Sequence, residues 1–256
     1  MTALRGLAAS CLLAALLHPP PAAAHPAAGR AGQVPSGPSP DALYAERDQP
    51  GRARAAARQW QASLDADPSD FEAAWKLARA LYWLGTQEGD TDTRRKDLES
   101  GVAAGRAAAR LRDDRPEGHF WMAANMGALA QSFGMRQGLR YRGAIKDALE
   151  RVLAIDPGFQ DGSADRALGR WYFKVPGLFG GSNDKAVAHL ERSLTYDPDS
   201  TASLLFLAEV HLDEGRKDEA RRLLRQVLDA PVHPDWGPED RVFKAQAREL
   251  LAKIGG

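Results

Sequence analysis

Proline recurs in this chain at the same point of a repeating pattern, where an apolar stretch with helical spacing ends. Pro68, Pro116, Pro157 and Pro198 are separated by 48, 41 and 41 residues, and Pro231 follows after 33 more. Because proline has no backbone N–H and clashes with the preceding turn, it cannot continue a helix. A regular period of this size predicts an array of helical repeats, and such arrays usually present binding surfaces.

The clearest unit of the pattern spans residues 200–229. Gly215 is expected to end its first helix, because glycine tolerates the left-handed backbone at a helix C-terminus. Ala208 and Ala220 are small enough to let two antiparallel helices approach closely. The unit resembles the tetratricopeptide repeat (TPR) in the order of its residues, which is Leu204, Leu207-Ala208, His211, Gly215, Ala220, Leu224 and Val227.

The other units match the same family more loosely. A degenerate first unit covers residues 42–66. The helices expected from apolar spacing after it cover 71–85, 97–111, 118–133, 142–154, 163–174 and 184–196, and a closing helix covers 238–254. A polar insertion is expected at 86–96. No stretch alternates with the period of a strand. We therefore predict an all-α fold, a right-handed α-solenoid of TPR-like helical hairpins over residues 41–256 with a C-terminal capping helix.

The N-terminal segment has the features of a secretory signal peptide. Arg5 precedes an apolar run at 6–17, and residues 22–24 are three alanines. The sequence predicts cleavage after residue 24, a disordered Pro/Gly/Ala-rich leader at 25–40, and a periplasmic or secreted protein. A membrane anchor is the alternative, but twelve apolar residues are too few to span a bilayer. Acylation of Cys11, as in a lipoprotein, is a weaker alternative.

Composition argues against several function classes. The 34 basic and 34 acidic side chains give a net charge of zero, so no general field attracts nucleic acid. Cys11 is the only cysteine, and its removal with the signal peptide would exclude disulfides and thiolate metal sites. The histidine spacings match no zinc motif, and no nucleophile or phosphate-loop motif is present. We expect no cofactor and no enzyme activity, with a hydrolase as a remote alternative.

The resemblance to TPR arrays implies that the first helix of each hairpin lines a concave groove. That groove would be rich in aromatic side chains, which are typical anchors for a protein or an apolar small molecule. The residues expected in it are Trp75, Arg79, Tyr82, Trp83, Phe120, Gln131, Trp171, Tyr172 and Glu209. The alternative is that about half of these aromatic residues belong to the hydrophobic core.

A loop at residues 175–183 interrupts the usual short turn of a hairpin. Leu178, Phe179, Gly180 and Gly181 make it a second candidate contact site, and Ser182 is expected to cap the next helix. On an exported helical-repeat chain, the segment 165–196 resembles the TatT-type periplasmic component of TRAP transporters. The alternative for the loop is a structural corner that packs Phe179 on the core.

Two functions follow from these expectations. The first is a non-catalytic protein-interaction scaffold or adaptor in the periplasm or cell envelope, with a protein partner. The second, implied by the TatT-like segment, is a small-molecule-binding accessory of a TRAP-type transporter. An open groove favours the scaffold, whereas a closed apolar tunnel favours the carrier.

Overall fold

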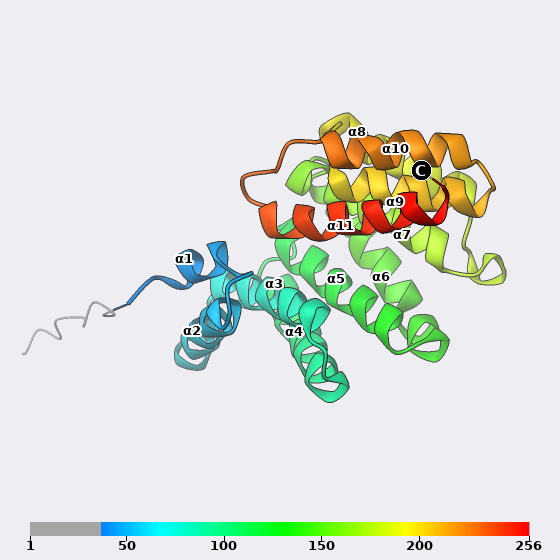
Figure 1. Cartoon of the computed structure of the whole chain (residues 1–256). Helices are drawn as coiled ribbons and strands as arrows, with labels where there is room; N and C mark the ends of the chain where they lie inside the picture. The colour runs from blue at the N-terminus through cyan, green and yellow to red at the C-terminus, as the bar shows by residue number, and fades with distance from the viewer. Residues whose placement is uncertain (1–36, 256) are drawn as a thin grey trace, which may run out of the picture. The chain divides into compact units, whose positions relative to one another are not determined.

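The computed structural model describes residues 37–255, and this part of the chain contains helices and connecting loops but no strand. The signal peptide and most of the leader expected from the sequence lie outside the described residues. The helices are α1 (Pro40–Ala45), α2 (Arg52–Ala66), α3 (Phe71–Gln87), α4 (Thr91–Leu111), α5 (Pro116–Ser132), α6 (Met135–Ile155), α7 (Phe159–Lys174), the 3-10 turn η1 (Gly177–Phe179), α8 (Asn183–Tyr196), α9 (Thr201–Asp213), α10 (Lys217–Asp229) and α11 (Gly237–Lys253) (Figure 1).

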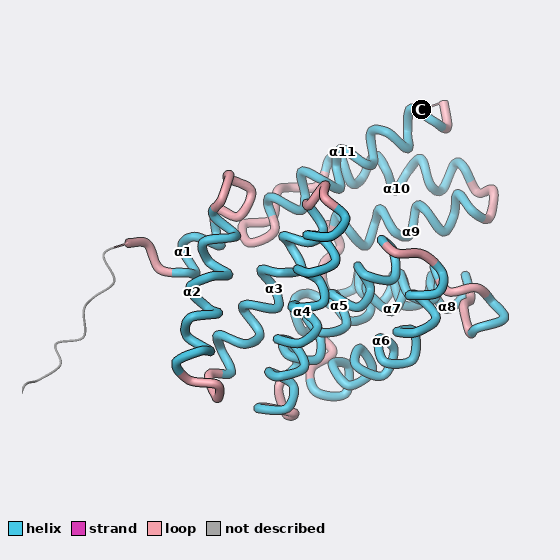
Figure 2. Tube along the Cα trace, turned by 90° about the horizontal axis from the view of Figure 1, so that it is seen from below, coloured by secondary structure: helices cyan, strands magenta, loops and turns pink. Residues whose placement is uncertain are grey.

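The helices pack as successive antiparallel hairpins, each stacked on the next. The hairpins are α3–α4, α5–α6, α7–α8 and α9–α10, and each odd-numbered helix from α3 to α9 also contacts the next odd-numbered helix (Figure 2). Helix α11 packs on both α9 and α10. The predicted α-solenoid with a capping helix is thereby confirmed.

The repeating prolines follow the second helix of each hairpin. Helices α2, α6, α8 and α10 each end two residues before a proline, and Pro116 is the first residue of α5. Polar side chains then cap several of the next helices. Asp70, Ser182 and Ser200 each accept a hydrogen bond from the backbone N–H three residues later, which supplies a partner for an otherwise free donor. The proposed cap at Ser182 is therefore confirmed.

Two helices are longer than the sequence pattern indicated. Helix α4 begins at Thr91, where the Asp90 side chain accepts from the Thr93 N–H at 2.8 Å, so most of the expected insertion at 86–96 is helical. Helix α6 begins at Met135 and not at 142. Both added turns are rich in polar residues, so hydrophobic periodicity did not reveal them.

Glycine sets the spacing between α4 and α5. A Cβ at Gly105 would lie 2.6 Å from the Met122 nitrogen, and one at Gly118 would lie 2.4 Å from the Ala109 nitrogen. Only glycine fits at such distances from a neighbouring backbone, so these two helices pack closer than side chains would allow. Asn125 adds a polar link, because its side-chain nitrogen donates to the Ala78 carbonyl of α3 at 3.0 Å.

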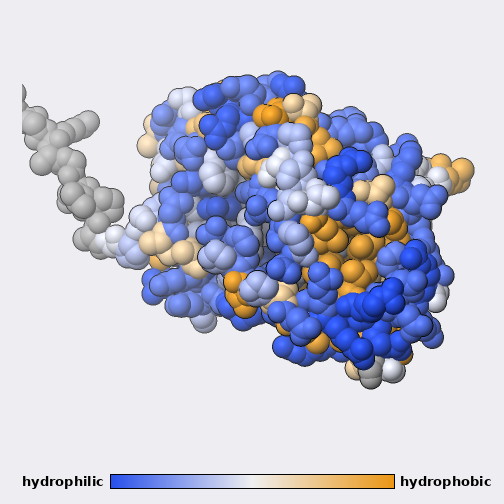
Figure 3. All heavy atoms as spheres, turned by 90° about the horizontal axis from the view of Figure 1, so that it is seen from above, coloured by the Kyte–Doolittle hydropathy of each residue, from blue (hydrophilic) through white to orange (hydrophobic). Residues whose placement is uncertain are grey.

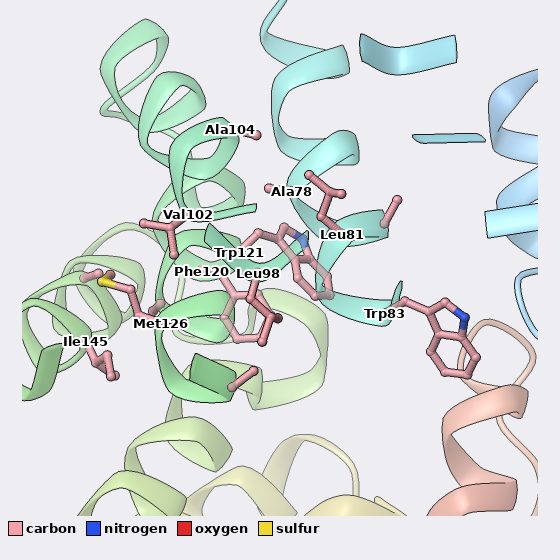
Figure 4. Close-up of a cluster of buried hydrophobic side chains, with 14 of the residues drawn as sticks. Ala78, Leu81, Trp83, Leu98, Val102, Ala104, Phe120, Trp121, Met126 and Ile145 are labelled. Atoms are coloured by element: carbon pink, nitrogen blue, oxygen red, sulfur yellow. The ribbon is translucent and has the colours of Figure 1, made fainter. Parts of the chain in front are cut away.

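The hydrophobic core runs along the array and continues into the last hairpin. Leu98, Phe120, Trp121 and Met126 gather between α3, α4 and α5, as Figure 4 shows. In the last unit Ala208 and Ala220 are completely buried, in a second cluster with Leu224. The close helix contact that the sequence predicted at these alanines is confirmed. The face drawn in Figure 3 is mostly hydrophilic, with hydrophobic atoms gathered most extensively to the right of its centre.

Candidate functional site

A cavity of about 1130 Å³ lies along the first helices of the hairpins. Helices α5, α6, α7, α9 and α11 supply most of its wall, and α3 contributes Tyr82. Aromatic side chains from four of these helices face it, namely Phe120, Trp121, Trp171, Phe206 and Phe243, and Trp236 precedes α11. Charged side chains of both signs also line it, from basic residues on α4, α6 and α7 to acidic residues near the starts of α7, α9 and α11. A concave site with aromatic walls and polar groups is a usual form of a binding site.

Four of the nine residues expected in a groove line this cavity. They are Tyr82, Phe120, Gln131 and Trp171. Trp171 is fixed at the wall by its indole nitrogen, which donates to the Arg142 carbonyl of α6 at 3.0 Å. Phe206 and Phe243 meet edge to face with their centroids 5.9 Å apart, which joins α9 to α11 across another part of the wall.

The other five expected residues lie outside the cavity wall and have structural contacts. The Arg79 guanidinium lies 4.2 Å from the Tyr44 ring centroid and 5.0 Å from that of Trp75. Tyr172 is buried and stacks on His189, with centroids 5.3 Å apart. Glu209 forms ion pairs with Arg170 and Lys174. Trp83 is 6% exposed and belongs to the core, where its ring lies beside the C-terminal helix (Figure 4).

Basic side chains form a row along α7 at the cavity wall. Arg166, Arg170 and Lys174 follow one another at four-residue spacing, so they share one face of the helix. Glu209 forms ion pairs with Arg170 and Lys174, and the Lys174 Nζ lies 3.2 Å from the Glu209 Oε2. Within residues 37–255, Arg166 has neither a carboxylate within ion-pair distance nor a hydrogen-bond partner.

Arg166 and Tyr82 are both partly desolvated at the cavity wall. Burial lowers the pKa of the Arg166 guanidinium, and the more distant charges of Asp197 and Asp161 only partly oppose this. Burial also raises the pKa of Tyr82, so its hydroxyl keeps its proton and remains a donor. Arg166 and Tyr82 thus add a positive charge and a neutral donor to a wall that also carries acidic side chains.

The glycine-rich loop after α7 is built as a tight corner. A Cβ at Gly181 would lie 1.6 Å from the Val175 carbonyl oxygen, and Gly180 has a φ of +101°. The Ser182 N–H donates to the Tyr172 carbonyl at 2.9 Å, which ties the loop back to α7. The Arg142 guanidinium carbon lies 5.3 Å from the Phe179 ring centroid. Leu178, by contrast, is 90% exposed.

The two ends of the described array are joined by a set of contacts that we call the latch. Arg47, in the loop between α1 and α2, donates through Nε to Glu239 at 3.0 Å and through Nη2 to the Asp235 carbonyl at 2.7 Å. The Trp83 indole donates to the Arg47 carbonyl at 3.0 Å, and Arg241 pairs with Asp48. Figures 1 and 2 both show the start of α11 beside this loop.

The guanidinium at the centre of the latch is buried and paired. Arg47 is 5% exposed. Burial alone would lower the pKa of Arg47, but the hydrogen bond and the charge of Glu239 outweigh burial, so the pKa is raised. The charge is therefore stabilised by its partners, and Glu239 and its neighbours form one end of the cavity wall.

The model of one protein family matches nearly the whole described region. This is "Regulator of microtubule dynamics protein 1-3", matched over residues 40–255. The chain belongs to this family. "Regulator of microtubule dynamics protein 1" of Caenorhabditis elegans is 25% identical over 195 residues, which cover 70% of this chain and 83% of that protein.

A solved TPR protein has a similar fold. The thermophilic TPR protein TTC0263 of Thermus thermophilus matches with a TM-score of 0.60 and 23% sequence identity. The match covers 79% of this chain and 92% of that one. At this level of identity the similarity establishes the fold alone.

Neither a metal site nor a membrane span is found within residues 37–255. No group of three or more His, Cys, Asp or Glu side chains in this range is arranged to hold a metal ion. None of the helices described there combines the length and the hydropathy that crossing a bilayer requires.

The most informative residues of the site, Arg166 and the pair Arg47 and Glu239, were not among those expected from the sequence. Arg166 lies one helical turn before Arg170, on the helix that was expected to line the groove. A search for basic residues on that face could therefore have found it. The latch joins Arg47 to Glu239, 192 positions apart, and no local sequence pattern indicates a pair so distant.

Proposed function

We propose that this chain is a non-catalytic protein-interaction scaffold that receives a segment of its partner in the cavity. The supporting observation is the aromatic wall contributed by separate helices. Large aromatic side chains at a concave site supply most of the binding energy in typical interfaces. The TPR fold agrees with this function, because helical repeat arrays commonly present extended concave binding surfaces.

Co-purification tests the proposal directly. The full chain would be tagged, expressed in its native cells and isolated with its partners for mass spectrometry. Phe206→Ala, in the cavity wall, is expected to weaken partner capture by more than about 1 kcal/mol, or at least fivefold. Leu178→Ala, on the exposed loop, is the matched control and should capture the partner normally. Equal loss in both variants, or in neither, would contradict binding in the cavity.

We also propose that the protein acts after export, in the periplasm or cell envelope, because the first 24 residues have the pattern of a signal peptide. N-terminal sequencing of protein isolated from the native cells is expected to begin at or near His25. An intact N-terminus at Met1 on the mature, functional protein would refute export.

Binding of a small molecule, as in an accessory of a TRAP-type transporter, is the second candidate. The latch favours it, because Glu239 both pairs with Arg47 and lines the cavity, so the two ends of the array meet at the cavity wall. Mass spectrometry of small molecules extracted from the purified native protein would test it. Recovery of one compound at near-equal molar amount, lost in Phe206→Ala, would favour this function over the scaffold.

The names of the family and of the worm relative refer to microtubules. A partner of that kind is one specific form of the proposed scaffold. Co-sedimentation of the purified chain with polymerised tubulin would test it, with Phe206→Ala and Leu178→Ala as cavity and loop variants.

A further inference from the structure

The charged side chains that line the cavity do not pair with one another. The basic ones are Arg94, Arg142, Arg166, Arg170 and Lys174. The acidic ones are Asp161, Asp197, Asp199, Glu239 and Asp240. Among residues 37–255 no ion pair joins a member of the first group to a member of the second. The ion pairs of Arg170, Lys174 and Glu239 go to side chains outside the wall. Opposite charges attract most strongly at short range, so the two groups occupy different parts of the wall.

The acidic residues gather where α7, α9 and α11 begin, at one end of the cavity. The His233 Nε2 lies 3.8 Å from the Asp161 carboxylate, and the His233 N–H donates to Asp240 at 2.7 Å. Asp240 also accepts from the Thr201 hydroxyl at 2.5 Å, which joins the start of α11 to the start of α9. The remaining carboxylates lie just before α9 and directly before Asp240 in the chain. We call these five carboxylates the acidic pole.

The basic residues lie toward the other end of α7 and on the helices beside it. Along α7 the charge changes from Asp161 near its start to Arg170 and Lys174 at its end. The Trp171 indole donates to the Arg142 carbonyl at 3.0 Å, so the end of α7 lies beside the first half of α6. Arg142 is therefore on the same side of the cavity as Lys174.

Arg94 reaches this end from the first turn of α4. The guanidinium of the next residue, Arg95, lies 3.8 Å from the ring centroid of Phe133, which directly follows α5. Helix α6 begins two residues later, so the starts of α4 and α6 lie together. Arg166 lies between the two ends, one turn before Arg170 on α7. We call the four basic residues at this end the basic pole, and they are Arg94, Arg142, Arg170 and Lys174.

Each pole has a charge without a described partner. The Arg142 side chain forms neither an ion pair nor a hydrogen bond among residues 37–255, and its guanidinium contacts only the face of Phe179 at 5.3 Å. At the acidic pole, the exposed Asp199 carboxylate has no such partner in the same range. These two charges are available to a bound molecule, one at each end.

Aromatic side chains follow the wall along α7 from one pole toward the other. Near the start of α7, Phe120 meets Phe159 edge to face with ring centroids 5.6 Å apart. Further along, the Arg170 guanidinium lies 4.4 Å from the Phe206 ring centroid. A molecule that fills the cavity therefore meets carboxylates at one end, aromatic rings along its length and basic groups at the other end.

We propose that the cavity binds a segment of the partner protein whose charge is divided in the same way. Basic side chains at one end of the segment lie on the acidic pole, acidic side chains at the other end lie on the basic pole, and apolar side chains lie between them. The inference rests on the proposed scaffold function and specifies its partner's chemistry. A segment is favoured over a small molecule because the cavity, at about 1130 Å³, exceeds the roughly 300–1,000 Å³ of a typical small-molecule pocket. Such complementarity fixes the direction of the segment.

Two peptides of identical composition test the proposal on the purified chain. The probe, acetyl-Lys-Lys-Leu-Phe-Ala-Leu-Phe-Glu-Glu-amide, carries its opposite charges at opposite ends. The matched control, acetyl-Lys-Glu-Leu-Phe-Ala-Leu-Phe-Lys-Glu-amide, has the same charges at both ends. Titration calorimetry is expected to show at least about tenfold tighter binding of the probe at low salt, and a smaller difference at high salt because salt screens exposed charges. Equal affinities at low salt would overturn the proposal.

Variants assign the preference to the two poles. Arg142→Gln and Asp199→Asn should each reduce the preference for the probe severalfold, because each removes the available charge of one pole. Lys217→Gln and Asp229→Asn, at exposed positions outside the cavity wall, are the matched controls and should leave it unchanged. A preference that survives the combined change of Arg142 and Asp199 would refute the two poles. Melting temperature would be measured on each variant, and Arg142→Lys, which keeps the charge, should keep the preference if Arg142→Gln is unstable.

Photo-cross-linking tests the direction of the bound segment. Benzoylphenylalanine would replace the phenylalanine nearer the Lys end in one probe and the phenylalanine nearer the Glu end in another. The first is expected to label residues 231–240 and the second residues 139–145, as mapped by mass spectrometry. The reverse pattern, or equal labelling of both regions by both probes, would contradict the proposed direction.

The peptide result and the scaffold function fail separately. If neither peptide binds the wild-type chain, a charge-divided segment is the wrong ligand. A partner that is recovered by co-purification and lost in Phe206→Ala would then leave the scaffold function standing. Failure of the peptides together with failure of co-purification would remove both.

Discussion

Two arginines in this molecule lie in partly or fully buried positions and have opposite surroundings. At the latch, Arg47 has its charge and its donors matched by Glu239 and by the Asp235 carbonyl. At the cavity wall, Arg166 has neither an ion-pair nor a hydrogen-bond partner among the described residues, although the charges of Asp197 and Asp161 act on it from a distance. Burying a charge is costly unless it is paired and hydrogen-bonded. The comparison contrasts an arginine whose partners join the two ends of the array with one whose side chain lines the cavity.

The largest effect is expected from Trp83→Ala, which removes the aromatic support of the latch. Trp83 is buried, donates to the Arg47 carbonyl and lies 5.4 Å from the Arg47 guanidinium. Loss of this side chain should cost about 4 kcal/mol of unfolding free energy, because a large cavity is left. Urea unfolding would measure it. A stable variant that fails to bind partner would instead place Trp83 in the groove, as the sequence pattern suggested.

A somewhat smaller loss is expected from Arg47→Leu. The change leaves the Glu239 carboxylate, which is 20% exposed, without its partner. Removing one member of a buried ion pair should lower the unfolding free energy by about 3 kcal/mol. The control is Arg52→Leu, because the exposed pair of Arg52 and Glu46 should contribute almost nothing. Equal effects of the two substitutions would mean that the latch does not stabilise the fold.

Arg166→Leu is expected to change the unfolding free energy in the opposite direction. Replacing an unpartnered, partly desolvated charge by an apolar side chain should maintain stability or raise it by up to about 1 kcal/mol. Thermal unfolding of the ligand-free protein would measure the change. A clear loss of stability would show that Arg166 has a structural role and would remove the contrast with Arg47.

The smallest effect is expected from Asp48→Asn, at the outer part of the latch. Both members of the pair of Arg241 and Asp48 are more than a third exposed. Such a pair should contribute less than about 0.5 kcal/mol, and salt should reduce this further. Unfolding at low and high ionic strength would measure it. A loss of unfolding free energy comparable to that of Arg47→Leu would mean that the exposed pair of Arg241 and Asp48 contributes as much to stability as the buried pair of Arg47 and Glu239.

The helical array was predictable because its signals are local. Proline marks the end of a repeat within a few residues, and the spacing of Ala208 and Ala220 shows which helix faces meet. Helix starts were less predictable. Helices α4 and α6 begin earlier than the pattern indicated, whereas the right-handed part of α7 begins near Ser163 as expected, because Gln160, Asp161 and Gly162 all have positive φ.

The candidate site was only partly predictable, because helical spacing identifies an inward face but not what that face contacts. Trp171 and Trp83 occupy comparable positions on first helices, yet one lines the cavity and the other meets the latch. Trp83 donates to the Arg47 carbonyl, and Arg47 pairs with Glu239, which lies 192 positions away in the sequence. No property of either tryptophan alone could distinguish them.

The latch also has a consequence for how the molecule opens. In an open repeat array each unit contacts only its neighbours, so unfolding can start by fraying at either end. Here the first loop and the last helix hold each other, and the terminal units are protected by one another. Amide hydrogen exchange in the first turn of α11 should therefore slow to the rate of the array's interior, and unfolding should become more cooperative than a chain of independent repeats allows.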